Sequence, residues 1–303
     1  MSNNRIKFNK YTLKFCLLLL GDFFVFPYLY LRRKSRNKLK KSTEETKKIR
    51  KPIKNKNLLV LLHEWGGYPS KRKKTIKKGV TFECGLEYQL KRFGTYNGNF
   101  TRFLYLSMSE SWKCENVTRI KEHADFFLEV SNNGMDFSGY SQFYKLNRNH
   151  ENSYVILTNS SVNASMDNVL DGYLKYMEEN PTVGILGVSY CTKMIQTFIR
   201  NNFKPHLQSF FLLTTIDVLD EIVKYNSGKF PGEGIDHKLL LIREGEIKIS
   251  QIALDLGYAL AVVNEDGSVF KFDQSISKKE WSLIHGDIRQ HIGQPNKLHP
   301  IKR

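Results

Sequence analysis

From residue 57 onward, short apolar segments alternate with segments of helical length, and this pattern limits the fold more than any other feature of the chain. Leu58 to Trp65 is a continuous apolar run, which is typical of a parallel strand buried on both faces. Further strands are expected at 101–109, 124–131, 153–162, 182–190 and 259–263, and helices at 80–93, 137–146, 169–179 and 246–256. This alternation predicts an α/β fold with a parallel sheet and helices on both of its faces.

The positive charge of the chain is concentrated at its N-terminal end. The formal net charge is +17, yet residues 1–78 alone carry 23 lysines and arginines against four acidic residues, which gives +19. The other 225 residues carry 24 basic and 26 acidic side chains and are close to neutral. A nucleic-acid-binding domain usually carries its basic patch on the folded surface, so we expect no nucleic-acid partner.

An apolar segment, Phe15 to Leu31, lies inside this basic region and is interrupted by Asp22 and Pro27. As a helix its 17 residues would be about 26 Å long, which is marginal for crossing a bilayer. The basic run Arg32 to Lys41 follows directly and suits contact with anionic lipid headgroups. We therefore predict that residues 1–33 are a membrane anchor, either single-pass or interfacial. A helix packed on the domain and a cleaved signal peptide are the alternatives.

The remaining boundaries follow from composition. Residues 34–56 are too polar to fold alone and are expected to form a basic linker. The folded domain is expected to span 57–275, and 276–303 to form a polar C-terminal tail. If the anchor spans the membrane, the basic residues that follow it favour a cytosolic domain.

Ligands of open α/β sheets bind outside the carboxyl ends of the strands, so polar clusters at those positions are the candidate binding residues. Three such clusters occur, at 132–136, 158–161 and 206–209, and they contain Asn132, Asp136, Asn159, Ser160, His206, Gln208 and Ser209. Each cluster also has a simpler interpretation. The first two could be turns with helix-capping side chains, and the histidine could be a structural one.

Glu246 stands at the expected start of the last long helix, and two roles are open for it. A carboxylate in the first turn is stabilised by the helix dipole, which requires no function. Alternatively, Glu246 is a general base that takes the proton of an attacking sugar hydroxyl. Glu244 and Glu233 are other candidates for that base.

Four segments in the same order resemble GT-A glycosyltransferases of cell-surface polysaccharide synthesis, in particular the rhamnan synthesis protein F group. They are VSNNGMDFSGY (130–140), VILTNSSV (155–162), HLQSFFL (206–212) and EIKISQIALDLGYALAVV (246–263). The resemblance implies an inverting transfer of a hexosyl or deoxyhexosyl unit from a nucleotide-sugar donor to a glycan or lipid-linked acceptor.

The resemblance also implies roles for the candidate residues. Asn132 and Asp136 would contact the nucleoside, and Asn159 and Ser160 would lie near the diphosphate. Glu246 would be the catalytic base. The donor sugar or the acceptor would be lined by His206, Gln208 and Ser209.

The chain departs from the family pattern at Ser160, where similar proteins usually carry an acidic residue. GT-A enzymes commonly use an aspartate there to hold a divalent ion, and Mn²⁺ or Mg²⁺ prefers carboxylate oxygens to a hydroxyl. The metal could be held elsewhere, for instance by Asp136 or His206, or cationic side chains could replace it. The third possibility is a non-catalytic GT-A-fold subunit or scaffold of a membrane-bound synthesis complex.

Overall fold

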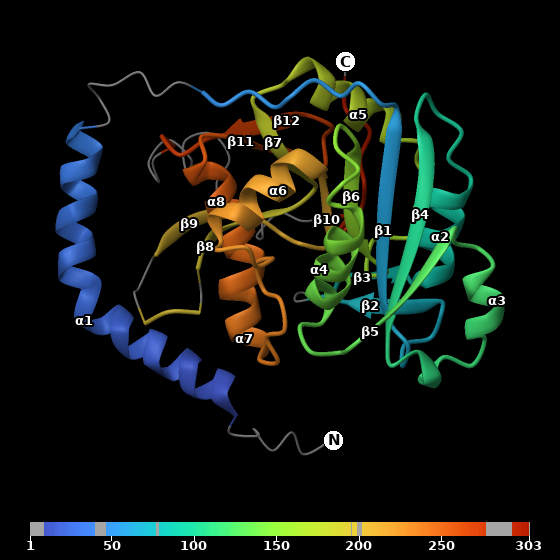
Figure 1. The fold of residues 1–303 in the computed structure, drawn as a ribbon, viewed down its shortest axis with the longest axis horizontal. Coiled ribbons are helices and arrows are strands. Elements are labelled where there is room, and N and C mark those ends of the chain that lie inside the picture. The colour runs from blue at the N-terminus through green and yellow to red at the C-terminus, as the bar shows by residue number, and fades with distance from the viewer. Residues whose placement is uncertain are drawn as a thin grey trace.

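A computed structural model describes residues 9–39, 47–76, 79–194, 196–198, 202–276 and 293–302 (Figure 1). The strands are β1 (Asn57–Trp65), β2 (Arg72–Thr75), β3 (Thr81–Cys84), β4 (Thr101–Ser109), β5 (Phe126–Val130), β6 (Tyr154–Asn159), β7 (Val183–Gly187), β8 (Tyr190–Lys193), β9 (Phe203–Leu207), β10 (Phe211–Thr215), β11 (Ala259–Val263) and β12 (Val269–Phe272). The helices are α1 (Lys10–Leu39), α2 (Leu86–Gly94), α3 (Val117–Lys121), α4 (Asp136–Asn147), α5 (Leu170–Glu179), α6 (Ile216–Tyr225), α7 (Lys238–Leu241) and α8 (Lys248–Asp255), with a 3₁₀ turn (Ser111–Lys113) and a π-helical turn (Ile242–Ile247).

Eight of the strands in the described residues form one sheet, in the order β12-β11-β7-β10-β6-β1-β4-β5. The pairs β1–β4, β1–β6, β4–β5 and β7–β11 are parallel. Strand β10 runs antiparallel to both of its neighbours, and β12 is antiparallel to β11. The expected α/β fold with a mostly parallel sheet flanked by helices is confirmed.

The two-residue period of the strands divides the core into two layers. On β1, Leu59 and Leu61 pack into the cluster that contains α4, α6 and α8, which Figure 1 shows partly in front of the sheet. The alternate residues Leu58, Val60 and Leu62 pack into the cluster that contains α2 and α5. All five side chains are buried, and each contributes about 1.5–3 kcal/mol by leaving water.

The strand order places a topological switch point at the carboxyl ends of β1 and β6. The chain leaves β1 for β4 and β5 on one side, and then crosses to β6 on the other side of β1. The connections that follow β1 and β6 therefore lead in opposite directions. This arrangement is where ligands bind in open α/β sheets.

Two expected helices have different limits in the structure. The segment expected as one helix at 80–93 is strand β3 followed by α2. The break is at Gly85, whose φ of 136° suits glycine and whose Cβ would lie 2.3 Å from the Ser70 carbonyl oxygen. The helix expected from Glu246 begins at Lys238, where the His237 ring accepts a hydrogen bond from the Leu240 amide (3.2 Å). Glu246 therefore lies inside a helical segment, and the capping interpretation does not apply.

The expected membrane-spanning anchor is not supported. Within the described residues, no helix has the length and apolar character needed to cross a bilayer. Instead, the first half of α1 packs on the domain, as the alternative interpretation proposed. Phe15 is buried and its ring lies 5.0 Å from the His237 ring, and Asp22 forms an ion pair with Arg243 (2.7 Å).

Parts of the expected linker and tail also pack on the domain. Arg50 is buried and its Nε donates to the Val183 carbonyl oxygen (2.5 Å), so the polar segment before β1 is not a free linker over its whole length. In the tail, Leu298 is buried and Tyr173 donates to the His299 carbonyl oxygen (2.8 Å). Residues 40–46, 277–292 and 303 of these two segments lie outside the described residues.

Helix α4 lies so close to the sheet that its packing can be tested at one glycine. A Cβ on Gly139 would lie 2.3 Å from Ser107 Oγ and 2.6 Å from His63 Nδ1. We expect Gly139→Ala to lower the free energy of unfolding by about 1–3 kcal/mol, measured by urea denaturation. The control is Gly172→Ala on α5, where nothing lies within 4 Å and alanine should be neutral or stabilising by up to about 1 kcal/mol. Equal stability of the two variants would contradict this packing.

Candidate functional site

A row of three polar side chains crosses the carboxyl edge of the sheet. In the strand register, His63 of β1 is paired with Ser107 of β4 on one side and with Asn159 of β6 on the other. Paired residues of neighbouring strands project from the same face, and here that face carries α4. His63 Nδ1 lies 2.9 Å from Ser107 Oγ.

Asp136 joins this row from the first turn of α4. Its Oδ2 accepts a hydrogen bond from Asn159 Nδ2 (2.5 Å), and its Oδ1 lies 4.0 Å from His63 Nε2. The turn from β5 into α4 places Gly134 and Met135 at positive φ (106° and 48°), so the chain reverses sharply just before the aspartate. The helix N-terminus favours the negative charge of Asp136.

His63 is almost completely buried, and this decides its protonation. Burial lowers the pKa of the imidazole, and the negative charge of Asp136 only partly opposes this. The ring is therefore neutral at pH 7 and acts as a hydrogen-bonding group in the row, not as a cation.

A second polar group lies on the opposite face of the same strand ends. Glu64 follows His63 and therefore projects away from α4, where it pairs with Arg72 of β2 (3.0 Å). The Arg72 guanidinium also donates to Ser160 Oγ (2.6 Å) and lies 4.3 Å from the centre of the Tyr68 ring. Burial raises the pKa of Glu64, and the neighbouring Arg72 opposes the shift.

Glu246 lies on the π-helical turn and binds Ser209. Its Oε2 accepts two hydrogen bonds, one from the Ser209 amide and one from the Ser209 hydroxyl, both of 2.9 Å. Single π-turns occur often at functional sites because they reposition side chains within a helix. Ser209 immediately precedes Phe210, whose carbonyl oxygen accepts from the Asn159 amide (3.2 Å). The Ser209–Glu246 pair therefore lies at the same sheet edge as the row.

Tyr140 connects the two carboxylates. It is fully buried on α4 and donates to the Ser209 carbonyl oxygen (2.8 Å). Burial raises its pKa well above the usual range, and the negative charges of Asp136 and Glu246 act in the same direction. The phenol thus connects α4, which carries Asp136, to Ser209, which binds Glu246.

The other predicted residues lie at this edge or near it. Asn132, which follows β5, accepts a long hydrogen bond at Oδ1 from the Ser109 hydroxyl (3.4 Å). Gln208 Oε1 accepts from the Ser189 hydroxyl (2.5 Å), at the end of β7. His206 is buried, and its Nδ1 lies 2.7 Å from the Lys204 carbonyl oxygen of its own strand, β9.

The sequence matches no protein-family model and no curated protein. Similar solved structures include the mannosyltransferase PcManGT from Pyrobaculum calidifontis, solved in complex with GDP-Man and Mn²⁺. It is 11% identical, with a TM-score of 0.41, and the match covers 82% of this chain and 65% of that chain. The bifunctional IspDF from Campylobacter jejuni has 10% identity and a TM-score of 0.36 over 69% of this chain and 49% of that chain. The chain thus spans less than two thirds of either protein. Similarity this distant transfers neither a substrate nor a metal to this chain.

The residues around Ser160 do not suit a divalent cation. A serine hydroxyl is a poor ligand for Mn²⁺ or Mg²⁺, and here the hydroxyl already accepts from the guanidinium of Arg72. Asp136, an alternative ligand, gives one carboxylate oxygen to Asn159. No group of three or more acidic, histidine or cysteine side chains in the described residues is arranged to hold a metal.

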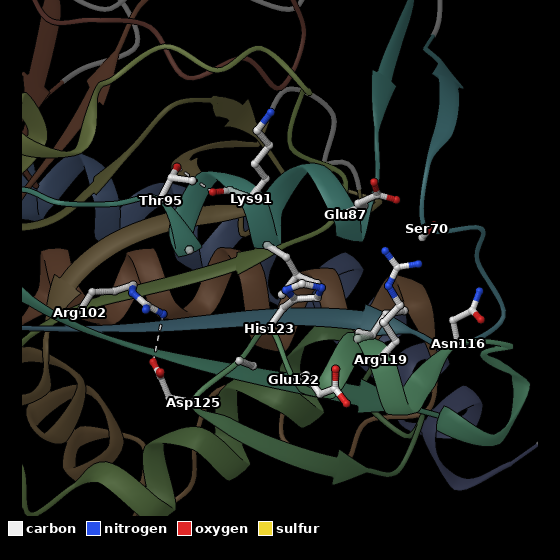
Figure 2. A pocket seen from close by; sticks show the side chains of 14 residues that line it. Ser70, Glu87, Lys91, Thr95, Arg102, Asn116, Arg119, Glu122, His123 and Asp125 are labelled. Carbon is white, nitrogen blue, oxygen red and sulfur yellow. Dashed lines mark hydrogen bonds and ion pairs between the residues drawn. The ribbon is translucent and has the colours of Figure 1, made fainter.

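Two cavities of the described structure lie away from this sheet edge. A cavity of about 650 Å³ lies between α2 and α3 (Figure 2), and its charged lining carries both signs. Its Arg102 is already paired with Asp125 (3.0 Å). A second cavity of about 420 Å³ is lined mainly by apolar residues of β4, β5 and α4. Neither contains a predicted site residue.

Proposed function

We propose that the chain is a glycosyltransferase that moves a hexosyl or deoxyhexosyl unit from a nucleotide-sugar donor to a glycan or lipid-linked acceptor. The observation that carries the proposal is the pairing of Glu246 with Ser209 at the same sheet edge as the Asp136–Asn159 contact. The resemblance of the four sequence segments to GT-A glycosyltransferases supports the same assignment.

In this proposal the donor lies across the carboxyl ends of β5, β4, β1 and β6. Asn132 and Asp136 contact the nucleoside, and Asn159 and Ser160 lie near the diphosphate. Ser209, with Gln208 and His206 beyond it, lies toward the donor sugar and the acceptor. The neutral His63 and its partner Ser107 line the base of the site and add no charge to it.

Glu246 is the general base. The acceptor hydroxyl oxygen attacks the anomeric carbon, and the bond from that carbon to the diphosphate oxygen breaks. Glu246 takes the hydroxyl proton, and the nucleoside diphosphate leaves with the bonding electron pair. Attack from the side opposite the leaving group inverts the configuration. The two hydrogen bonds from Ser209 fix one oxygen of the carboxylate and so orient the base.

We propose further that cationic side chains of β2 meet the charge of the diphosphate. Arg72 and Lys74 are two residues apart and therefore project from the same face of β2, while Lys73 projects from the other. Desolvation lowers the pKa of Lys74, although much of its side chain is exposed. The positive charge of Arg72 lowers the pKa further, and the negative charge of Asp136 opposes this shift. Lys74 therefore shares a strand face with Arg72, whose guanidinium contacts Glu64 and Ser160 at the ends of β1 and β6.

Binding of a nucleoside diphosphate is therefore expected to survive chelation. Calorimetry with UDP, GDP, CDP and ADP should give one preferred ligand, with a Kd that changes less than about twofold between EDTA and Mn²⁺. Lys74→Gln should weaken that binding about tenfold, because a charge-assisted hydrogen bond is lost. Lys73→Gln is the matched control and should leave it unchanged. A strict requirement for Mn²⁺ would contradict the cationic site.

The second candidate function is a non-catalytic GT-A-fold subunit of a synthesis complex. Ser160, in the place where similar proteins carry an acid, favours it. Nucleoside-diphosphate binding by a well-folded protein that shows no turnover with any donor would select this alternative.

A further inference from the structure

The first half of α1 has an unusual distribution of polar and apolar side chains. Asp22 points toward the domain, where it binds Arg243 through both carboxylate oxygens (2.7 and 2.9 Å) and accepts from the Thr197 hydroxyl (2.8 Å). Thr12 is also buried on this side. Phe15 is buried there as well, and Leu18 and Leu19 pack against the same core, so the inward side carries both kinds of residue. A helix that only covered a protein core would carry polar residues on its outward side.

The outward side of the same helix segment is apolar. Phe23 and Phe24 are 69% and 77% exposed, and Leu17 is 59% exposed. Leu13 and Leu20 are exposed on the same segment. Single exposed apolar residues are ordinary, but five on one helix segment of twelve residues form a surface that favours a nonpolar partner.

The sequence that follows identifies the partner by its charge. Seven of the ten residues from Arg32 to Lys41 are lysine or arginine, and Lys10 and Lys14 lie near the start of α1. An exposed apolar face combined with this density of positive charge suits an anionic lipid surface. A second copy of the chain would bring the same positive charges together, which would oppose self-association.

We propose that α1 lies in the plane of an anionic membrane surface, with Leu17, Phe23 and Phe24 in the boundary between headgroups and acyl chains. The Asp22–Arg243 ion pair holds the helix on the domain, so that the whole protein sits on one side of the bilayer. Figure 1 shows the first half of α1 beside α7, and α7 leads directly through the π-turn to Glu246. Membrane contact therefore sets the candidate site near the surface, which suits a lipid-linked acceptor. This last step rests on the proposed function, whereas the membrane contact does not.

The test is flotation of the full-length protein with vesicles of phosphatidylcholine alone and of phosphatidylcholine with about one-third phosphatidylglycerol. We expect binding to the anionic vesicles and weaker binding in high salt. The double variant Phe23→Ser with Phe24→Ser should partition at least about tenfold less, because two large apolar side chains no longer enter the lipid. The matched control is Leu146→Ser with Tyr225→Ser, two exposed apolar residues on α4 and at the end of α6, and should bind as wild type.

Thermal unfolding of each variant checks that the domain remains folded. Failure of the wild-type protein to float with anionic vesicles would overturn the proposal. So would equal loss in the control pair. The protein could instead bind to neither kind of vesicle and sediment as a dimer that the Phe23 and Phe24 substitutions dissociate. In that case the exposed apolar side of α1 contacts a second copy of the chain. Because flotation needs no donor, its result does not depend on whether the chain transfers sugar.

Discussion

Replacing Glu246 by glutamine is expected to lower the rate of sugar transfer about 10²- to 10⁴-fold, with little change in donor affinity. Glutamine keeps a side-chain oxygen that can accept from Ser209, so the geometry of the site is preserved. It cannot take the proton of the acceptor hydroxyl. The measurement is kcat with the preferred donor and acceptor, together with donor binding by calorimetry.

The control for this variant is Glu244→Gln, on the same helical turn. Glu244 pairs with Lys248 (3.1 Å), not with Ser209, so its loss should change kcat less than about twofold. Wild-type turnover by Glu246→Gln would remove Glu246 from the mechanism. A large loss in Glu244→Gln alone would transfer the role of base to that residue.

Replacing Arg72 by glutamine is expected to give the largest loss of stability. The partner carboxylate of Glu64 is buried, and removing one member of a buried ion pair typically costs about 3–5 kcal/mol, because the other charge is left unpaired. Urea denaturation measures the loss. The double variant Glu64→Gln with Arg72→Gln removes both charges and should recover most of it. If the single variant is as stable as wild type, the pair contributes little to the fold.

The loss in Arg72→Gln should also depend on pH. Burial already raises the pKa of Glu64, and Arg72 is the largest opposing influence, so the pKa should rise further without it. When the pKa of a carboxyl is higher in the folded than in the unfolded protein, its ionised form destabilises the fold at pH values above the folded-state pKa. This destabilisation decreases as the pH falls and the folded protein binds the proton. The deficit relative to wild type should therefore be larger at pH 7.5 than at about pH 5. The double variant should show no such pH dependence.

Much of the fold follows from local sequence patterns, and the exceptions have physical causes. The continuous apolar run of β1 and the alternation after it predict the mostly parallel sheet. The antiparallel direction of β10 depends on which strands it pairs with, and no local pattern encodes this. The start of α7 does not follow from the sequence because its N-cap is His237, which is not one of the usual capping residues. The burial of Asp22 was missed because its partner Arg243 is 221 residues away.

The rule that polar residues at strand ends form the site predicts Asn132, Asp136 and Asn159 as candidates, and the structure brings the last two together. It could also have identified His63 and Glu64, which end an apolar strand in the same way. The sequence does not single them out, because they lie within an apolar run that is interpreted as one strand.

The position of Arg72 does not follow from the sequence, for a different reason. It belongs to the basic N-terminal region, in which every lysine and arginine has the same sequence context of positive charge. Its contacts with Glu64 and Ser160 depend on how the hairpin of β2 and β3 packs against the ends of β1 and β6. A charge count along the sequence cannot separate one buried arginine from its exposed neighbours.

Incubation of the purified full-length protein with a panel of nucleotide sugars tests the proposed function most directly. Release of the nucleoside diphosphate can be followed with and without glycan or lipid-linked acceptors. We expect one preferred donor, release of its nucleoside diphosphate, and loss of that release in Glu246→Gln. A well-folded protein that neither binds a nucleoside diphosphate nor consumes any donor would contradict both the assignment as a glycosyltransferase and the assignment as a non-catalytic donor-binding subunit.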